Sequence, residues 1–138
     1  MDIVKARAEI ISKLEELLTP LTPLRSVEPF AGQLSAGSDF LKKMPAALVH
    51  YSASSFSQYG RNSYNYDLDF EIWLFTNIKK YEFKNIELID KLIWECLLKI
   101  MEINEIVVQT VEEGYVDNNI MAYTIRIKYE PVEVIGNE

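Results

Sequence analysis

Two kinds of hydrophobic pattern occur along the chain, and the first of them predicts its helices. Over residues 2–18 apolar side chains recur every three or four positions, which is typical of an amphipathic helix. The same spacing over residues 85–101 predicts a second helix. Pro20 and Pro23 end the first helix, because proline lacks a backbone N–H and clashes with the preceding turn.

Strict alternation of apolar and polar residues predicts the strands. The clearest one spans residues 64–76, where apolar side chains at even positions face away from polar ones at odd positions. Trp73 and Phe75 break the alternation, so we expect a helix or a neighbouring subunit to cover that end of the strand. A second alternating strand is predicted over residues 120–129.

The remaining predicted elements are shorter. The strands are residues 25–30 at a sheet edge, residues 46–51 in the core and residues 106–111. The connections are a mobile loop at about residues 31–44, a hairpin connection over residues 52–61, a turn at residues 112–114 and a short polar C-terminal arm at about residues 130–138. The sequence therefore predicts a single α+β domain over residues 1–138, a mainly antiparallel sheet with two amphipathic helices packed on its apolar face.

Composition narrows the classes of function. The chain has 138 residues, of which 49% are hydrophobic and 25% charged, so a folded domain is expected. One Cys and one His argue against a disulfide scaffold and a His-clustered metal site. The net charge of −7 argues against a nucleic-acid or anionic-membrane binder. The acidic start does not match a secretory signal, and the longest apolar runs are far below the roughly 20 residues that span a bilayer.

The polar residues that could carry chemistry have simpler structural interpretations. His50 lies in a predicted buried strand next to several serines, but the sequence has no Gly-x-Ser-x-Gly nucleophile motif. Cys96 lies on the apolar face of the second helix. Asp67, Asp69 and Glu71 could hold a hard cation or act as a glycosidase pair, although carboxylates on a solvated strand face are the commoner case. We predict no catalytic, cofactor-binding or metal-binding residue and no enzyme activity.

The aromatic residues are more informative. Tyrosine is enriched in protein interfaces because it buries a large area at a low cost in entropy. A carbohydrate platform is a second interpretation, and packing within the sheet is the simplest one. We predict protein-interface residues in the hairpin and at the end of the long strand: Tyr51, Phe56, Tyr59, Tyr64, Tyr66, Trp73 and Phe75.

The order of elements and two short segments carry a family resemblance. After the opening helix comes Ser-Val-Glu-Pro-Phe-Ala-Gly at residues 26–32, and Met-Pro-Ala-Ala-Leu-Val at residues 44–49 leads into a strand. A long strand, an amphipathic helix and a final β pair follow. With its Pro-Ala-x-x-Val segment, most of the chain resembles the small tail-terminator or neck proteins of tailed phages, in particular the Mu-like contractile-tail neck family.

The resemblance implies an α+β subunit that forms a homo-hexameric ring and catalyses no reaction. Such a ring belongs to the neck of the virion and is assembled in the host cytoplasm, from a phage or a prophage. It caps the tail tube, stops its polymerisation and joins the tail to the head-completion or connector protein, with the sheath as a further candidate partner. DNA would pass through the lumen without sequence-specific recognition, and no cofactor or membrane is involved.

Two other functions stay open on the residues alone. The first is a small ligand-binding or enzymatic domain that acts as a dimer, with a pocket lined by Tyr64, Tyr66 and His50. The second is an adaptor or sugar-binding module that uses the tyrosine-bearing face around Tyr59.

Overall fold

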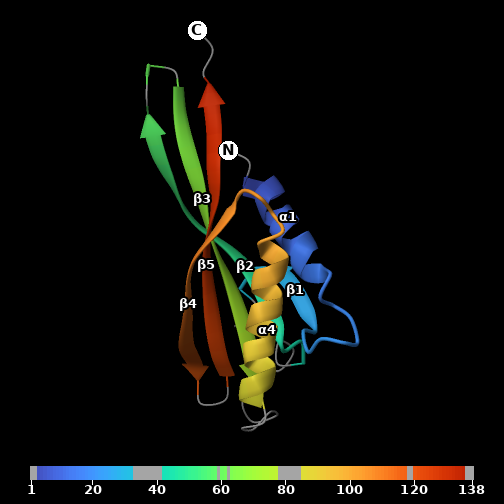
Figure 1. Cartoon of the computed structure of the whole chain (residues 1–138). Helices are drawn as coiled ribbons and strands as arrows, with labels where there is room; N and C mark the ends of the chain where they lie inside the picture. The colour runs from blue at the N-terminus through green and yellow to red at the C-terminus, as the bar shows by residue number, and fades with distance from the viewer. Residues whose placement is uncertain are drawn as a thin grey trace.

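The computed structural model describes residues 3–32, 42–58, 60–61, 63–77, 85–117 and 120–135. Five strands form one sheet, and both helices lie on the same side of it (Figure 1). The helices are α1 (Ile3–Glu15) and α4 (Asn85–Ile100), and the strands are β1 (Ser26–Pro29), β2 (Ala46–Gln58), β3 (Ser63–Asn77), β4 (Ile106–Asp117) and β5 (Ile120–Ile135). The predicted α+β architecture with two helices on one sheet is confirmed.

The strands are arranged in the order β1-β2-β3-β5-β4. β1 pairs in parallel with β2, and the other three pairs are antiparallel. β1 has four residues and lies at the sheet edge, where its Pro29 costs little pairing. β3 pairs along its length with β2 on one side and β5 on the other, so it is the centre of the sheet.

α1 packs on the sheet through a face spaced at helical intervals. Ile10 and Leu14 are fully buried on that face. The helix ends at Glu15, earlier than predicted, because the chain tightens into a turn in which Leu17 N donates to Leu14 O at 3.0 Å. The turn leads the chain toward β1 at the sheet edge.

α4 also buries one face, through Leu92, Cys96 and Ile100. α4 is linked at the surface to the turn that follows α1, where Lys99 Nζ lies 3.3 Å from Glu16 Oε1. This hydrogen bond raises the pKa of Lys99 and lowers the pKa of Glu16. The pair is exposed, so it contributes little to stability.

The sheet has two different faces. On the helix side, the even-numbered residues of β3 pack against the helices, as the alternation predicts. Phe70 and Ile72 lie at the centre of this main core, beside Ile125 and Ile127 of β5. We call the opposite surface the open face, because neither helix lies on it (Figure 1).

A second, smaller core lies at one end of the open face. It is built from Met44, Ala46, Leu48 and Phe75, with Phe30 and Trp73 packed against it. This cluster explains why the alternation of β3 breaks. The chain's own residues bury Phe75, and no described helix covers this end of the strand, whereas Trp73 is only half-buried, so its cover by a neighbouring subunit stays a prediction.

The structure describes only part of the predicted mobile loop at about residues 31–44. Residues 33–41 lie outside the described part of the chain. At its end, however, Met44 is buried in the second core, and Lys43 Nζ lies 2.9 Å from Glu28 Oε1. These last residues of the predicted loop therefore pack against the sheet.

Two predicted connections are strand instead. β2 continues to Gln58, through most of the predicted hairpin connection, with a bulge at Ser52. β4 likewise continues through residues 112–114, where a turn was predicted, and Gly114 pairs with Ala122 of β5. In both cases pairing with a long neighbouring strand outweighs the turn preference of serine and glycine.

The predicted C-terminal arm is also a strand. β5 runs to Ile135 and pairs with the beginning of β3. Pro131 does not end the pairing, because it falls where the register shifts between Tyr66 and Leu68 of β3. At such an irregularity the missing N–H of proline costs no ladder hydrogen bond.

Candidate protein–protein interfaces

The outer ends of β2, β3 and β5 extend past both helices as a three-stranded arm (Figure 1). On its helix side, the ring centroid of Phe56 lies 5.8 Å from that of Tyr64 and 5.6 Å from that of Tyr66. Phe56 is 59% exposed, whereas Tyr66 is only 4% exposed. Phe56 therefore has an accessible ring, and its predicted role in an interface stays a prediction, while Tyr66 belongs to the core. Tyr59 lies outside the described residues.

Tyr51 is half-buried at the base of this arm. Its ring packs edge-on against Phe70, with centroids 5.7 Å apart, and its hydroxyl forms a 2.5 Å hydrogen bond with Ser54 Oγ. Both contacts are within the chain. They give Tyr51 a packing role in this structure, and its predicted role in an interface stays a prediction.

Trp73 and Phe75 differ in how far their side chains are exposed to a partner. Phe75 is 2% exposed, so the chain's own second core already covers it. Trp73 is half-buried and packs against Phe30 and His50, each with ring centroids 4.8 Å from its own. Of the two, Trp73 keeps an accessible edge on the open face.

A row of charged side chains crosses the open face beside Trp73. Arg126 Nη1 lies 2.8 Å from Glu71 Oε2, and His50 Nδ1 lies 3.4 Å from Glu71 Oε1. On the other side, Arg126 Nε lies 3.5 Å from Glu112 Oε1. His50 thus packs against Trp73 and lies beside the Glu71 carboxylate, which agrees with a structural interpretation of this residue.

The aspartates of β3 are less solvated than the alternation suggests. Asp67 Oδ2 lies 3.6 Å from Lys128 Nζ, and both side chains are mostly buried. Asp69 is half-buried, and its Oδ1 has no hydrogen-bond partner among the described residues. Within the part of the chain that the structure describes, no group of three or more His, Cys, Asp or Glu side chains is arranged to hold a metal ion.

The hypothetical pocket lined by Tyr64, Tyr66 and His50 is not assembled. Tyr66 packs in the main core on the helix side, whereas His50 contacts Glu71 on the open face. Tyr66 and Glu71 are an odd number of residues apart in one strand, so they point to opposite faces. The sheet therefore separates His50 from the two tyrosines.

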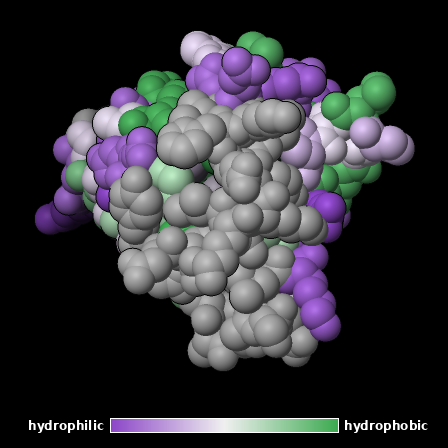
Figure 2. All heavy atoms as spheres, turned by 90° about the horizontal axis from the view of Figure 1, so that it is seen from below, coloured by the Kyte–Doolittle hydropathy of each residue, from purple (hydrophilic) through white to green (hydrophobic). Residues whose placement is uncertain are grey.

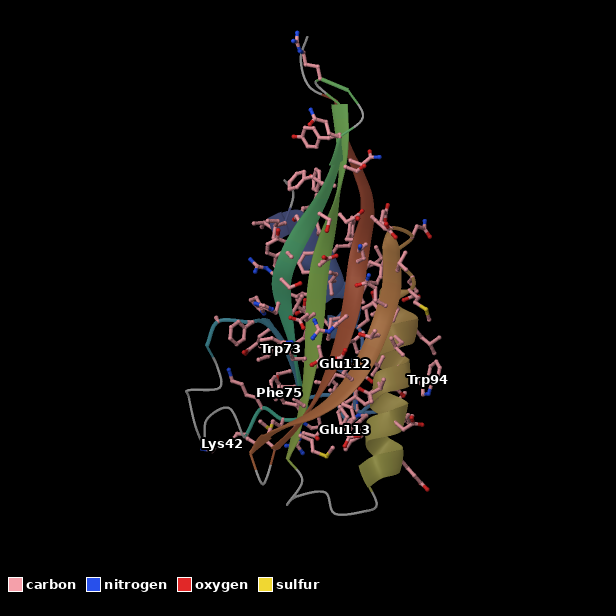
Figure 3. The ribbon with its side chains drawn as sticks, turned by 90° about the vertical axis from the view of Figure 1, so that its left-hand side faces the viewer. Lys42, Trp73, Phe75, Trp94, Glu112 and Glu113 are labelled. Atoms are coloured by element: carbon pink, nitrogen blue, oxygen red, sulfur yellow. The ribbon has the colours of Figure 1, made fainter. Side chains whose placement is uncertain are left out.

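One exposed apolar surface was missed at the sequence level. Trp94 and Leu98 of α4 recur with Met101, the residue after the end of α4, at spacings of four and three residues, and they lie opposite the buried face of the helix; we call these three residues the α4 stripe. Trp94 is 56% exposed and Leu98 is 59% exposed. Figure 3 shows Trp94 pointing away from the sheet. Their spacing was a usable signal, but the stronger apolar face of the same helix obscured it.

Cys96 is fully buried on the inner face of α4, as predicted. Burial raises the pKa of its thiol to about 12, and the neighbouring carboxylate of Glu95 adds to the effect. A thiol in this environment stays protonated and shielded from solvent. It packs as a small hydrophobic side chain.

Hydrophobic residues also reach the surface on more than one side of the molecule when it is seen from below, with hydrophilic residues between them (Figure 2). Among the described helices, none combines the length and the apolar character that crossing a bilayer requires.

No protein-family model matches the chain, and no curated protein matches it.

Proposed function

We propose that this chain is a structural subunit of a phage-type neck, which assembles with its own copies into a ring and caps a tail tube. The family resemblance of the sequence suggests this role. The observation that carries the proposal is the exposure of apolar side chains on both layers of the fold. The helix layer exposes the α4 stripe, and the sheet layer exposes an edge of Trp73.

Two different surfaces on one subunit are what a ring requires. In a head-to-tail contact, one surface of a copy meets the other surface of the next, and the chain of contacts closes when the rotation between copies allows it. Exposed apolar patches of this kind usually mark sites of association. The arm with Phe56 offers a further surface, which extends past the helices and is available to a partner other than a neighbouring copy.

The charge of the chain also supports the proposal. Each copy has a net charge of −7, so a ring of such copies would carry a large excess of negative charge. That charge would repel the DNA backbone and keep passing DNA from adhering to the wall.

Electron microscopy of the purified chain mixed with tail tubes tests this function. We expect a ring at one end of each tube and no further growth when tube protein is added. The Trp94→Ala variant is expected to lose this activity, while Leu21→Ala, which also truncates an exposed apolar side chain, keeps it. Tubes that grow equally with and without the wild-type chain would contradict the proposal.

A further inference from the structure

We propose that the outer part of β2 pairs with the same strand of a second copy, antiparallel and across a two-fold axis at Phe56. We call residues 52–58 of β2 the β2 edge. A two-fold contact joins each chain to one copy and does not close a ring. The inference therefore goes beyond the proposed function, and this second copy is not a neighbour within the ring.

The β2 edge has a neighbouring strand on one side only. Its residues pair with β3, whereas β1 pairs only with residues 46–49 of β2. Among the described residues, no other strand and no backbone hydrogen bond occupies this side of residues 52–58. Its outward N–H and C=O groups can therefore bind the backbone of a further extended strand.

The other two sheet edges are protected against such pairing. Exposed edges are normally blunted by short length, proline, charge or bulges. β1 has four residues and contains Pro29, while β4 exposes Glu112 and Glu113 and has two register shifts against β5. The β2 edge has no proline and no charge, and after its bulge at Ser52 it pairs regularly with β3. It is therefore the edge best suited to strand addition.

Phe56 favours a second copy as the added strand. It is the one large hydrophobic side chain of the β2 edge, and it is 59% exposed. Its neighbour within the sheet is Tyr66 of β3. In an antiparallel pair of identical strands centred on Phe56, its neighbour on the other side is the partner's Phe56. The two rings then cover each other, as cross-strand aromatic pairs do.

The charges of the two free strands also select β2 for self-pairing. When the axis lies at Phe56, Ser54 faces Gln58 of the second copy, and Ser55 faces Ser57 in the same way. No like charges meet along residues 52–58. Self-pairing of β4 would instead bring the exposed Glu112 and Glu113 of both copies into one contact, and their repulsion opposes it.

The shape of the arm leaves room for the second copy. The outer ends of β2, β3 and β5 extend past both helices (Figure 1). The last residue of β2, Gln58, would lie opposite position 54, which is five positions beyond Val49, where pairing with β1 ends. The paired segment therefore stops before β1 begins, and the two domains lie at opposite ends of the joint sheet. Such a short contact predicts weak association.

Sedimentation equilibrium tests this contact in a chain that does not form the proposed ring. Trp94→Ala is the background, because it removes the centre of the α4 stripe and leaves β2 unchanged. We expect a reversible dimer at concentrations up to about 1 mM. Adding Phe56→Lys places two ammonium groups opposite each other and should weaken dimerisation by about tenfold or more. Adding Val111→Lys, at an exposed apolar residue of β4, is the control and should leave it unchanged.

Crosslinking gives a second test that keeps Phe56. In the proposed register, the two copies of residue 57 are diagonal neighbours about 7–8 Å apart, so a short bis-maleimide should join them in Ser57→Cys. Thr110→Cys places an exposed thiol on β4 and should stay mostly uncrosslinked. The native Cys96 is buried and unreactive, so Trp94→Ala alone is the background control.

The outcomes separate this inference from the proposed function. Monomers at every concentration and no covalent dimer from Ser57→Cys would overturn the inference, while tube capping by the wild type would still decide the ring. Dimers that resist Phe56→Lys, or that crosslink through Thr110→Cys instead, would show a different contact and would also overturn it. Circular dichroism spectra like that of Trp94→Ala would show that each added substitution leaves the fold intact.

Discussion

Arg126 and Glu71 form the closest ion pair of the open face, with Nη1 of the arginine 2.8 Å from Oε2 of the glutamate. The two residues are direct cross-strand neighbours in β5 and β3. Only 13% of the Glu71 side chain is exposed, and His50 lies on its other side. The carboxylate thus links three adjacent strands across the centre of the sheet.

Removing this carboxylate should destabilise the fold. Glu71→Ala leaves Arg126 without its closest partner, so we expect a loss of about 1–3 kcal/mol in the free energy of unfolding. Glu112→Ala removes the outer, more exposed partner of the same arginine and should cost no more than about 0.5 kcal/mol. Urea unfolding monitored by tryptophan fluorescence measures both. Equal losses in the two variants would show that the central position of Glu71 has no effect.

Tyr129 and Glu9 connect the sheet to α1. Tyr129 Oη donates to Glu9 Oε2 at 2.8 Å, between residues that are far apart in the sequence. Tyr129→Phe removes this hydrogen bond and should cost about 1–2 kcal/mol, because the acceptor is charged. A double-mutant cycle with Glu9→Ala should give a coupling energy of about 0.5–1.5 kcal/mol. Strict additivity of the two substitutions would mean that the bond does not hold α1 in place.

The pairing of Asp67 changes what charge reversal is expected to do. A solvated aspartate would tolerate Asp67→Lys, but here the new ammonium group would lie beside Lys128 on a mostly buried surface. We expect Asp67→Lys to lower the free energy of unfolding by about 1–3 kcal/mol, and Asp67→Asn by less. Thermal unfolding compares the two. Identical melting temperatures for Asp67→Lys and the wild type would restore the interpretation of a freely solvated strand face.

Cys96 makes stability depend on pH in the alkaline range. Burial raises the pKa of the thiol from 9.0 to about 12. Above pH 9 the unfolded chain releases this proton, whereas the folded chain holds it until about pH 12, so the folded state loses stability as pH rises. The expected loss is about 1.4 kcal/mol per pH unit relative to Cys96→Ala, which has no thiol to titrate. Parallel stability curves for the wild type and Cys96→Ala above pH 9 would contradict the burial of the thiol.

The parts of the fold with strong periodicity could be predicted from the sequence. Ile10 and Leu14 on one helix face, and Phe70 and Ile72 on one strand face, are buried as their spacing indicates. Local pattern is sufficient in these cases, because each element buries a single continuous face.

The remaining elements depend on pairing that the local sequence does not encode. The serine-rich end of β2 is a strand because β3 lies beside it, and the end of β5 extends past Pro131 for the same reason. Of the predicted interface residues, Tyr66 and Phe75 are buried by contacts from distant segments. Trp94 was not predicted, because the pattern of α4 was assigned to a single face.

The central claim is that this chain functions by assembling with copies of itself, and electron microscopy of the concentrated, purified chain tests it most directly. We expect closed rings of uniform diameter in the wild type and dispersed subunits in Trp94→Ala. A field of single subunits in the wild type at every concentration would contradict the claim.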